Sequence, residues 1–259
     1  MNIAITGSKG YVGSALVKAL MTTKYDLYLY DLESWDIKSP IKNIIKNIDV
    51  VIHLAAIVSI EETYRKPDEC FKTNFEGTKN VINAFPNAKI IFASSATVYN
   101  LTSPYAKSKK MSEDLIMKRC SDYAILRFFN IGGGSPTNPK GIFLSAVEAI
   151  ENGNFIIHGN DYPTKDGTCL RDYIHIDDVI NTIIKLISLP PVLEPQNILS
   201  QKQYTVLEYI ECFKKVNKAS FKINYMARRP GEVDKLCYPK KSNFFSPEKE
   251  LDDIVLINQ

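Results

Sequence analysis

Two serines and a tyrosine–lysine pair stand close together in the sequence and could carry out proton transfer. Ser94 and Ser95 follow the apolar run 90–93, which is typical of a buried strand that delivers polar groups to the edge of a sheet. Tyr105 and Lys109 follow a proline, so they are predicted to lie one turn apart on the same face of a helix. A phenol has an ordinary pKa of about 10, and a neighbouring ammonium would favour its anion and make it a base. An ordinary amphipathic pair has the same spacing, so the rest of the chain must decide.

A glycine-rich turn near the N-terminus favours the chemical interpretation. The apolar strand predicted over 2–6 runs into Gly7, Gly10 and Gly13, and a helical pattern of apolar residues follows. Glycines at such a turn allow a phosphate to approach backbone amides, and the helix N-terminus favours its negative charge. The spacing is GxxGxxG, set between a strand and a helix, and it predicts a dinucleotide site.

Acidic residues after the next predicted strand, 25–30, indicate which dinucleotide is bound. Asp31 stands where a carboxylate would accept hydrogen bonds from the adenosine ribose. Glu33 adds a second negative charge, and along the chain no basic residue follows before Lys38. A 2′-phosphate would be repelled, so the cofactor is predicted to be NAD and not NADP.

Strands and helices alternate through the first 130 residues, which predicts an α/β fold with a doubly wound parallel sheet. Further strands are predicted at 35–37, as a truncated third strand, and at 49–54, 90–95 and 123–128, with helices at 67–85 and 105–120 and a helical stripe of Ile41, Ile44, Ile45 and Ile48. Residues placed to meet the dinucleotide are Asp36, Ile37, Leu54, Ala55 and Ala56. His53 is interpreted as a packed core histidine.

A smaller second region is predicted after Asn130, where a Gly/Pro-rich loop at 132–141 ends the regular alternation. We expect 1–130 to form the NAD-binding domain and 131–259 a smaller substrate-binding domain, with 172–199 folding back onto the first. Arg228 and Arg229 could be a solvated edge or, together with Arg171, could clamp a diphosphate through bidentate hydrogen bonds.

The composition is that of an ordinary globular protein. The 259 residues carry a net charge of +3, which does not indicate nucleic acid or an anionic membrane as a partner. Five scattered cysteines without C-x-x-C spacing indicate neither a disulfide framework nor a metal site. No signal peptide or apolar run of 18 residues is evident, so a cytoplasmic location is expected.

Taken together, these motifs resemble those of the extended short-chain dehydrogenase/reductase family, and within it the UDP-glucose (UDP-galactose) 4-epimerases. The matching motifs are Gly7/Gly10/Gly13, Asp31, HLAA at 53–56, Asn74, SSATVY at 94–99, YAKSK at 105–109, FN at 129–130, GNDYPTKDGTCLRDYIH at 159–175 and ARRPGEV at 227–233. The resemblance implies that Tyr105 is the base, that Lys109 holds the nicotinamide ribose and lowers the pKa of the tyrosine, and that Ser95 assists. It adds Asn74 to the cofactor site.

The same resemblance implies a nucleotide-sugar site and a homodimer formed through helices near 67–85 and 105–120. The residues expected to contact the substrate are Ser95, Thr97, Asn130, Arg171, Tyr173, Arg229 and Glu232. Asn130 and the two arginines would bind the diphosphate, and Glu232 the uridine ribose. No uracil ligand is assigned from the 132–141 loop.

The chain departs from the 4-epimerase pattern at three places. The connection 96–104 is short, Val58 stands where a lysine is usual, and 32–48 is abbreviated as in deoxysugar 4-ketoreductases. Sugar 4,6-dehydratases carry carboxylates just after the strand-end serine, because eliminating water needs its own acid and base. Ala96 and Thr97 cannot supply them, so no elimination is expected.

The predicted function is therefore an NAD-dependent nucleotide-sugar 4-epimerase acting on UDP-glucose and UDP-galactose or their N-acetyl forms. A 4-keto nucleotide-sugar reductase is the first alternative, because the chain is short and its loop trimmed. A non-catalytic NAD-binding regulatory protein is the second, and the retention of Ser95, Tyr105 and Lys109 argues against it.

Overall fold

The computed structural model describes residues 1–41, 47–134, 141–236, 242, 245 and 247–257. The chain divides into two compact units, Met1–Phe128 with Thr182–Gln196, and Phe129–Asn181 with Asn197–Gln259. The division falls within helix α7, Ile176–Ser188, and within strand β9, Val192–Ile198. Each unit is described by itself below.

The first unit contains a six-stranded sheet in the order β2-β1-β3-β4-β5-β9. Its other strands are β1 Asn2–Thr6, β2 Asp26–Tyr30, β3 Val50–His53, β4 Lys89–Ser95 and β5 Tyr123–Phe128. Neighbouring strands from β2 to β5 pair in parallel, so their carboxyl ends meet at the same edge of the sheet. The predicted parallel α/β sheet is confirmed.

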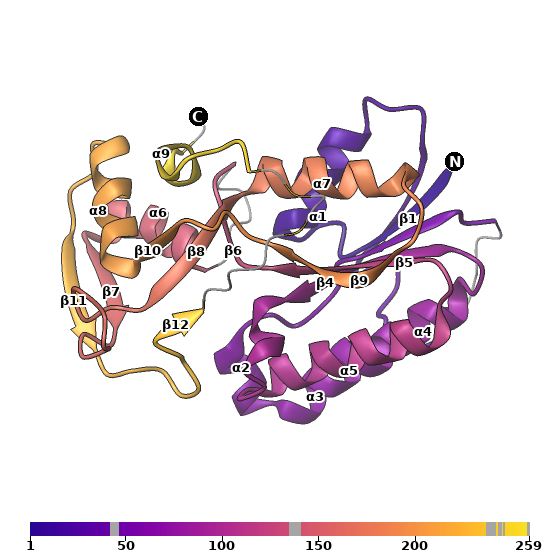
Figure 1. Ribbon diagram of the computed structural model, residues 1–259, viewed down its shortest axis with the longest axis horizontal. Helices are drawn as coiled ribbons and strands as arrows, with labels where there is room; N and C mark the ends of the chain where they lie inside the picture. Colours follow the sequence, from indigo (N-terminus) through magenta and orange to yellow (C-terminus); the bar gives the residue numbers. More distant parts are fainter. Residues whose placement is uncertain (42–46, 135–140, 237–241, 243–244, 246, 258–259) are drawn as a thin grey trace. The chain divides into compact units, whose positions relative to one another are not determined.

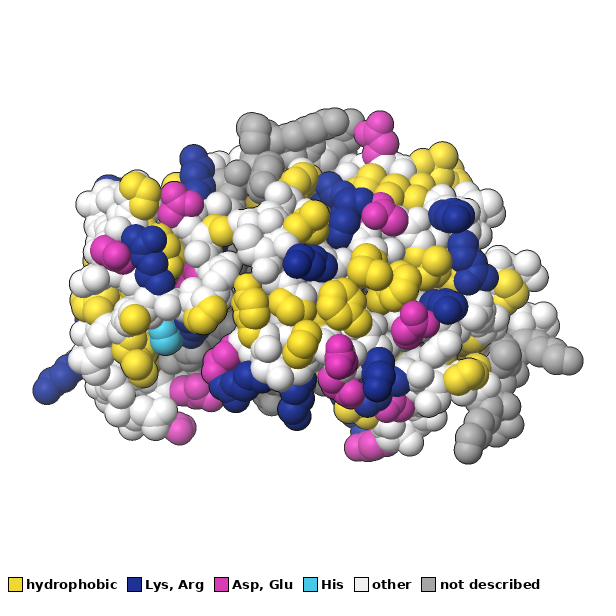
Figure 2. Space-filling model, turned by 90° about the horizontal axis from the view of Figure 1, so that it is seen from below, with side chains coloured by type: hydrophobic (Ala, Val, Ile, Leu, Met, Phe, Trp, Pro, Cys, Tyr) yellow, Lys and Arg dark blue, Asp and Glu magenta, His cyan; other side chains and the backbone are white. Residues whose placement is uncertain are grey.

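Helices cover both faces of this sheet. They are α1 Tyr11–Leu20, α2 Ile60–Arg65, α3 Pro67–Phe71, the π-helical turn η1 Lys72–Glu76, α4 Gly77–Ala84, the 3₁₀ turn η2 Ala96–Tyr99 and α5 Pro104–Arg119. Figure 1 shows α3, α4 and α5 below the sheet and α1 above it. Figure 2 shows hydrophobic side chains among lysines and arginines on the lower, helical side. Tyr64 of α2 and Met111 of α5 are 39% and 40% exposed.

The predicted third strand at 35–37 is wrong, because the described stretch 31–41 contains no strand. The backbone of Trp35 donates to the Asp31 carbonyl and its ring donates to the Ser39 carbonyl, so both make local bonds in place of a strand ladder. Trp35 and Ile37 are nevertheless buried in the core. The alternating apolar residues Trp35 and Ile37 therefore pack into the core without forming a strand.

The predicted helix at 67–85 exists as one continuous helical segment with a π-helical turn at its centre. Of the predicted stripe of isoleucines, Ile44 and Ile45 lie outside the described residues, and Ile48 is buried. The helix at 105–120 is confirmed as α5, which begins at Pro104 because the side chain of Ser103 accepts from the Ala106 amide.

The second unit is built around strand β8, Leu170–His175. Its other elements are β6 Asn130–Gly132, α6 Ile142–Asn152, β7 Asn154–His158, β10 Gln203–Thr205, α8 Val206–Val216, β11 Lys222–Met226, β12 Lys235–Leu236 and α9 Leu251–Val255. Strand β8 pairs antiparallel with β10 and parallel with β6 and β12, and β7 pairs parallel with β11. Its core contains two aromatic groups: Phe213 contacts Phe143 and Phe221, and the ring of Tyr173 lies tilted against that of Tyr209.

Candidate active site

The glycine turn after β1 is closed against neighbouring backbone. Gly7 has a φ of +73°, and a Cβ there would lie 2.7 Å from the Ala55 nitrogen. A Cβ on Gly13 would lie 2.1 Å from the Gly7 carbonyl oxygen, while one on Gly10 would meet only that oxygen, at 3.2 Å. Only glycine fits at the first and third positions, and α1 begins directly after the second. These features fit the diphosphate of a dinucleotide at the start of α1.

Asp31 follows β2 and lies beside this turn. Its two carboxylate oxygens accept from the backbone amides of Lys9 and Leu32, each at 2.9 Å. The Lys9 ammonium forms an ion pair with Glu33, so a basic residue does stand beside the two carboxylates. The expectation that none did was wrong, because the register of β1 with β2 brings residues 7–9 next to 31–33.

Asp36 and Ile37, the two residues expected near the adenine, differ in solvent exposure. Asp36 is half-buried, and its carboxylate accepts from the Lys38 amide and pairs with the Lys38 ammonium at 3.3 Å. Ile37 is 3% exposed and packs against Gly77 of α4, so its side chain belongs to the core. Asp36 is the more accessible of the two.

The segment that follows β3 is held by Asn74. Leu54, Ala55 and Ala56 are partly exposed there. Asn74 lies in η1, is 2% exposed, and both accepts from the Ile57 amide at 2.8 Å and donates to the Ile57 carbonyl at 3.0 Å. Its side chain therefore fixes the path of the 54–57 backbone.

His53 is a packed histidine, as predicted. Its ring nitrogens contact the hydroxyls of Thr6 at 2.7 Å and Thr78 at 2.9 Å, and the side chain is 1% exposed. Burial lowers the pKa of His53 to about 3, helped by the nearby Lys109 ammonium. A neutral ring held by two threonines is a structural group. Val58 is 42% exposed at the end of this segment.

Ser95, Tyr105 and Lys109 come together at the end of β4. Tyr105 and Ser95 are each 9% exposed, and Ser95 is near enough to influence the pKa of Tyr105; the Ser95 hydroxyl also accepts from the Thr97 hydroxyl at 3.0 Å. The Lys109 ammonium donates to the Ala93 carbonyl at 2.8 Å and is 2% exposed. The strand and the first turns of α5 thus place three groups capable of proton transfer in one buried cluster.

The pKa values in this cluster are set mainly by burial. Burial raises the pKa of Tyr105 to about 12, and the influence of the Ser95 side chain acts in the opposite direction. Burial lowers the pKa of Lys109 to about 8, against the influence of Cys70 and Glu113. The shift of the phenol is upward, opposite in direction to the lowering expected from Lys109, because loss of hydration dominates and Cys70 adds to it.

Of the expected substrate residues of the second unit, Glu232 contacts Arg171, and Arg229 is bonded to Glu232. The Arg171 side chain is buried in β8 and donates to the Leu170 and Val233 carbonyls, each at 2.9 Å, and to Glu232 at 3.3 Å. The Glu232 amide donates to the Arg229 carbonyl at 3.2 Å, so those two residues share one turn. Arg229 itself is exposed.

The remaining residues of this group are structural in part. Asn130 donates to the Asp172 carbonyl at 3.1 Å, and Tyr173 is buried with its ring 4.4 Å from that of Tyr209. Arg228, one of the two adjacent arginines, pairs with Asp161 at 2.8 Å and stacks on Tyr162. Arg228 is therefore engaged locally, and Arg229 is the more available for a ligand.

Sequence reasoning missed Glu113 and Arg127, a buried ion pair next to the Ser95–Tyr105–Lys109 cluster. A charged residue on the buried face of a predicted helix is a signal that a partner must exist, but the sequence does not say which. Among the described residues no group of three or more His, Cys, Asp or Glu side chains could hold a metal ion. None of the described helices combines the length and apolarity needed to cross a membrane.

A parallel sheet with a glycine turn after its first strand and a Ser–Tyr–Lys cluster after its fourth defines a dinucleotide-dependent enzyme of the extended short-chain dehydrogenase/reductase type. The chain belongs to the NAD dependent epimerase/dehydratase family, whose model matches residues 3–199. The predicted family is thereby confirmed.

Individual relatives agree with the narrower resemblance. UDP-glucose 4-epimerase of Yersinia enterocolitica is 31% identical over 90% of this chain and 88% of its own length. That of Bacillus subtilis is 28% identical over 90% of this chain and 87% of its own. The solved structure of UDP-glucose 4-epimerase from Bifidobacterium longum, in complex with NAD⁺ and UDP, is similar with a TM-score of 0.83, 25% identity and coverage of 98% of this chain and 96% of that one.

Proposed function

We propose that this protein is an NAD-dependent nucleotide-sugar 4-epimerase acting on UDP-glucose and UDP-galactose or their N-acetyl forms. The observation that carries the proposal is the burial of Ser95, Tyr105 and Lys109 at the end of β4 and the start of α5, with Lys109 one turn beyond Tyr105 on the same helix. The similarity to UDP-glucose 4-epimerases over nine-tenths of the chain supports the substrate class.

NAD would be held by residues of the first unit, which fit it. Gly7, Gly10 and Gly13 leave room for the diphosphate, Asp31 would meet the adenosine ribose, and Lys109 would meet the nicotinamide ribose. When bound, NAD supplies the reversible acceptor for the hydride at C4 of the sugar. Side chains of the protein would carry out proton transfer and hold the substrate in position.

Tyr105 would take the proton from the C4 hydroxyl and return it. A phenol with a pKa near 12 is almost wholly protonated at neutral pH and cannot take up a proton, so its anion must be favoured when the site is filled. The Lys109 ammonium, already in the cluster and on the same helix face, is the cation that would do so. Ser95, with Thr97 beside it, would hydrogen-bond the same substrate oxygen.

The nucleotide would be bound by the second unit. We assign Arg171, Arg229 and Asn130 to the diphosphate, Glu232 to the ribose, and Tyr173 to a position near them. The ion pair between Arg171 and Glu232 supports this grouping, because it holds a diphosphate ligand and a ribose ligand next to each other. By these assignments 1–130 is the NAD-binding domain and 131–259 the nucleotide-sugar-binding domain.

A 4-keto nucleotide-sugar reductase is the second candidate. The specific observation in its favour is the short connection between β4 and α5, in which η2 is followed by only four residues, 100–103. A reductase would consume reduced cofactor in proportion to substrate, whereas an epimerase returns the hydride that it borrows. A homodimer and a cytoplasmic location remain predictions.

The test compares wild type with Tyr105→Phe, which removes only the hydroxyl. Conversion of UDP-galactose to UDP-glucose is followed by chromatography, beside NADH oxidation on a 4-keto nucleotide sugar. We expect interconversion without net NADH change, and a loss of about 10²-fold to 10⁴-fold in the variant with NAD binding retained. No interconversion by wild type, with steady NADH oxidation on the keto sugar, would establish the reductase instead.

A further inference from the structure

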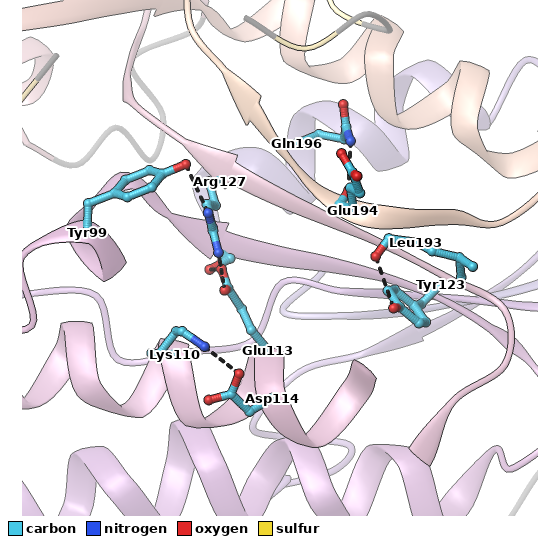
Figure 3. A network of polar contacts seen from close by, with 10 residues as sticks. Tyr99, Lys110, Glu113, Asp114, Tyr123, Arg127, Leu193, Glu194 and Gln196 are labelled. Atoms are coloured by element: carbon cyan, nitrogen blue, oxygen red, sulfur yellow. Dashed lines mark hydrogen bonds and ion pairs between the residues drawn. The ribbon is translucent and has the colours of Figure 1, made fainter. Parts of the chain in front are cut away.

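A buried ion pair lies beside the candidate catalytic cluster, and the reaction as proposed does not use it. Glu113 of α5 is completely buried and accepts from the Arg127 guanidinium through both oxygens, at 2.9 Å from Nε and 2.6 Å from Nη2. Arg127 lies on β5, and its Nη1 donates to the Tyr99 hydroxyl at 2.9 Å. Figure 3 shows Arg127 between Tyr99 and Glu113.

Each end of this network adjoins a residue of the candidate site. Glu113 also accepts from the Ser94 hydroxyl at 2.6 Å, and Ser94 is the direct neighbour of Ser95. Glu113 is one turn beyond Lys109 on α5, and Tyr99 closes the η2 turn that starts after Ser95. The network therefore joins the strand end, the short connection and the helix that carry the three candidate catalytic groups.

We propose that Glu113 and Arg127 are positioning residues of the active site, which hold Ser95, Tyr105 and Lys109 in their mutual arrangement. This inference rests on the proposed function. Glu113 and Arg127 act through Ser94, Tyr99 and α5 and do not touch substrate or cofactor themselves. The Arg127 guanidinium also stacks on the Tyr99 ring, 4.8 Å from its centroid, which fixes the turn in a second way.

Stability alone does not explain such a pair. Removing two charges from water costs several kcal/mol per ion, and well-packed apolar residues of similar volume are often equal or better for stability. What the ion pair adds is geometry, since a bidentate arginine–carboxylate contact defines both distance and orientation. Within the short connection 96–104, Arg127 fixes Tyr99 through both a hydrogen bond and a ring contact.

The charge of Glu113 also affects Lys109. Lys109 is faced by Cys70 of α3, His53 of β3, and Tyr105 and Glu113 of its own helix. Burial lowers the pKa of Lys109, and Glu113 opposes that shift. Cys70 opposes the shift as well, but burial raises the pKa of its thiol, so Glu113, the partner of Arg127, is the carboxylate here that favours the Lys109 ammonium. Loss of this charge should move the Lys109 pKa further down.

The decisive variant is Glu113→Gln, with Asp114→Asn as its matched control. Asp114 is the residue after Glu113 on the same helix, and it forms an exposed ion pair with Lys110 (Figure 3). For Glu113→Gln we expect kcat to fall by at least about tenfold while substrate KM and the Kd of UDP stay near wild type. The alkaline limb of the kcat/KM profile should move to lower pH. Asp114→Asn should change none of these.

A second readout does not depend on the substrate. The Lys109 Nζ is titrated by NMR in the NAD-free protein, with an expected pKa of about 8 in wild type and in Asp114→Asn and a lower value in Glu113→Gln. If wild type fails to interconvert any UDP-sugar but Lys109 shifts as expected, the proposed function is wrong and the positioning role stands. An unshifted Lys109 with unchanged kcat overturns the positioning role.

Two further variants cover the case in which Glu113→Gln does not fold because Arg127 is left without its counter-charge. The double replacement Glu113→Leu/Arg127→Leu removes both charges, and Tyr99→Phe removes one exposed hydroxyl from the end of the network. We expect lower kcat in both, with a larger loss in the double variant. If the double variant folds and keeps the wild-type kcat, the proposal is contradicted. If the double variant does not fold, a wild-type kcat in Tyr99→Phe contradicts it instead.

Discussion

The Lys9 ammonium in the glycine turn is paired with the Glu33 carboxylate beyond the second strand. Lys9 stands close to where a 2′-phosphate of NADP would have to lie, because its own amide bonds Asp31. Glu33 neutralises this lysine, which keeps the neighbourhood of Asp31 negative. Discrimination against NADP thus depends on Glu33 as well as on Asp31.

Replacing Glu33 by Gln should therefore narrow the preference for NAD. Without the Glu33 charge, the Lys9 ammonium can attract the 2′-phosphate more strongly, so we expect NADP affinity to rise severalfold with NAD affinity little changed. Calorimetric titration with both cofactors measures the ratio. Glu61→Gln, which breaks an exposed pair with Arg65 elsewhere, serves as the control. Asp31→Ala should instead weaken NAD, and equal binding of both cofactors by wild type would contradict the carboxylate interpretation.

Lys109 should reduce stability at neutral pH. Its folded pKa of about 8 lies below its ordinary value of 10.5, so the unfolded state binds more protons between these values and stability rises with pH across that interval. Below pH 8 the full penalty, about 3 kcal/mol, is present. Lys109→Met removes this penalty and should raise the free energy of unfolding at pH 7. The lost bond to Ala93 should reduce that gain by about 1 kcal/mol.

The difference in free energy of unfolding between Lys109→Met and wild type should disappear as the pH rises from about 8 to 10.5. Denaturant unfolding at pH 7, 8.5 and 10 measures it, and Lys110→Met on the same helix is the control. A Lys109→Met protein that is less stable than wild type at pH 7, or an advantage independent of pH, would contradict the shifted pKa.

Two buried tyrosines should respond differently to loss of their hydroxyls. The Tyr30 hydroxyl is buried without a hydrogen-bond partner among the described residues, whereas the Tyr123 hydroxyl donates to the Leu193 carbonyl at 3.1 Å. Tyr30→Phe should be neutral or stabilising by up to about 1 kcal/mol, and Tyr123→Phe destabilising by about the same amount. Thermal unfolding of both variants checks this, and equal losses would indicate that Tyr30 does have a partner.

Replacing either arginine assigned to the diphosphate by Lys should weaken UDP binding, but only one of the two replacements should also reduce stability. Arg171→Lys breaks buried bonds to Leu170 and Val233, so both the melting temperature and the affinity for UDP should fall. Arg229→Lys alters an exposed side chain, so only the affinity for UDP should fall. Arg228→Lys is the control, and unchanged UDP binding in Arg229→Lys would make Arg229 a surface residue.

The elements that depend on local pattern could be predicted from the sequence. Tyr105 and Lys109 share a helix face because α5 begins at Pro104, and the glycine turn follows from the residue types that it requires. These features follow from periodicity and steric constraints over a few residues. The same holds for the burial of His53 after an apolar strand.

The contacts that depend on tertiary register could not be predicted. Lys9 meets Glu33 only because β1 and β2 pair with Thr6 opposite Tyr30, and Arg171 meets Glu232 across 61 residues. The missing third strand is a related case, since the sequence around Trp35 has the right apolar residues but the backbone forms local turns instead. The direction of the Tyr105 pKa shift likewise depends on burial, which no spacing reveals.

The π-helical turn at Lys72–Glu76 lets the helical segment from Pro67 to Ala84 hold one residue more than an unbroken α-helix would over the same path. Within this turn the carbonyl of Asn74 accepts from the Thr78 and Ser112 hydroxyls, at 2.6 and 2.9 Å. Deleting one residue of the turn would therefore leave an unbroken α-helix with Val81 and Ile82 still facing the core. Deleting one residue of α4 before Val81 would instead rotate these two side chains by about 100°, so the segment tolerates a deletion far better at the π turn than in α4.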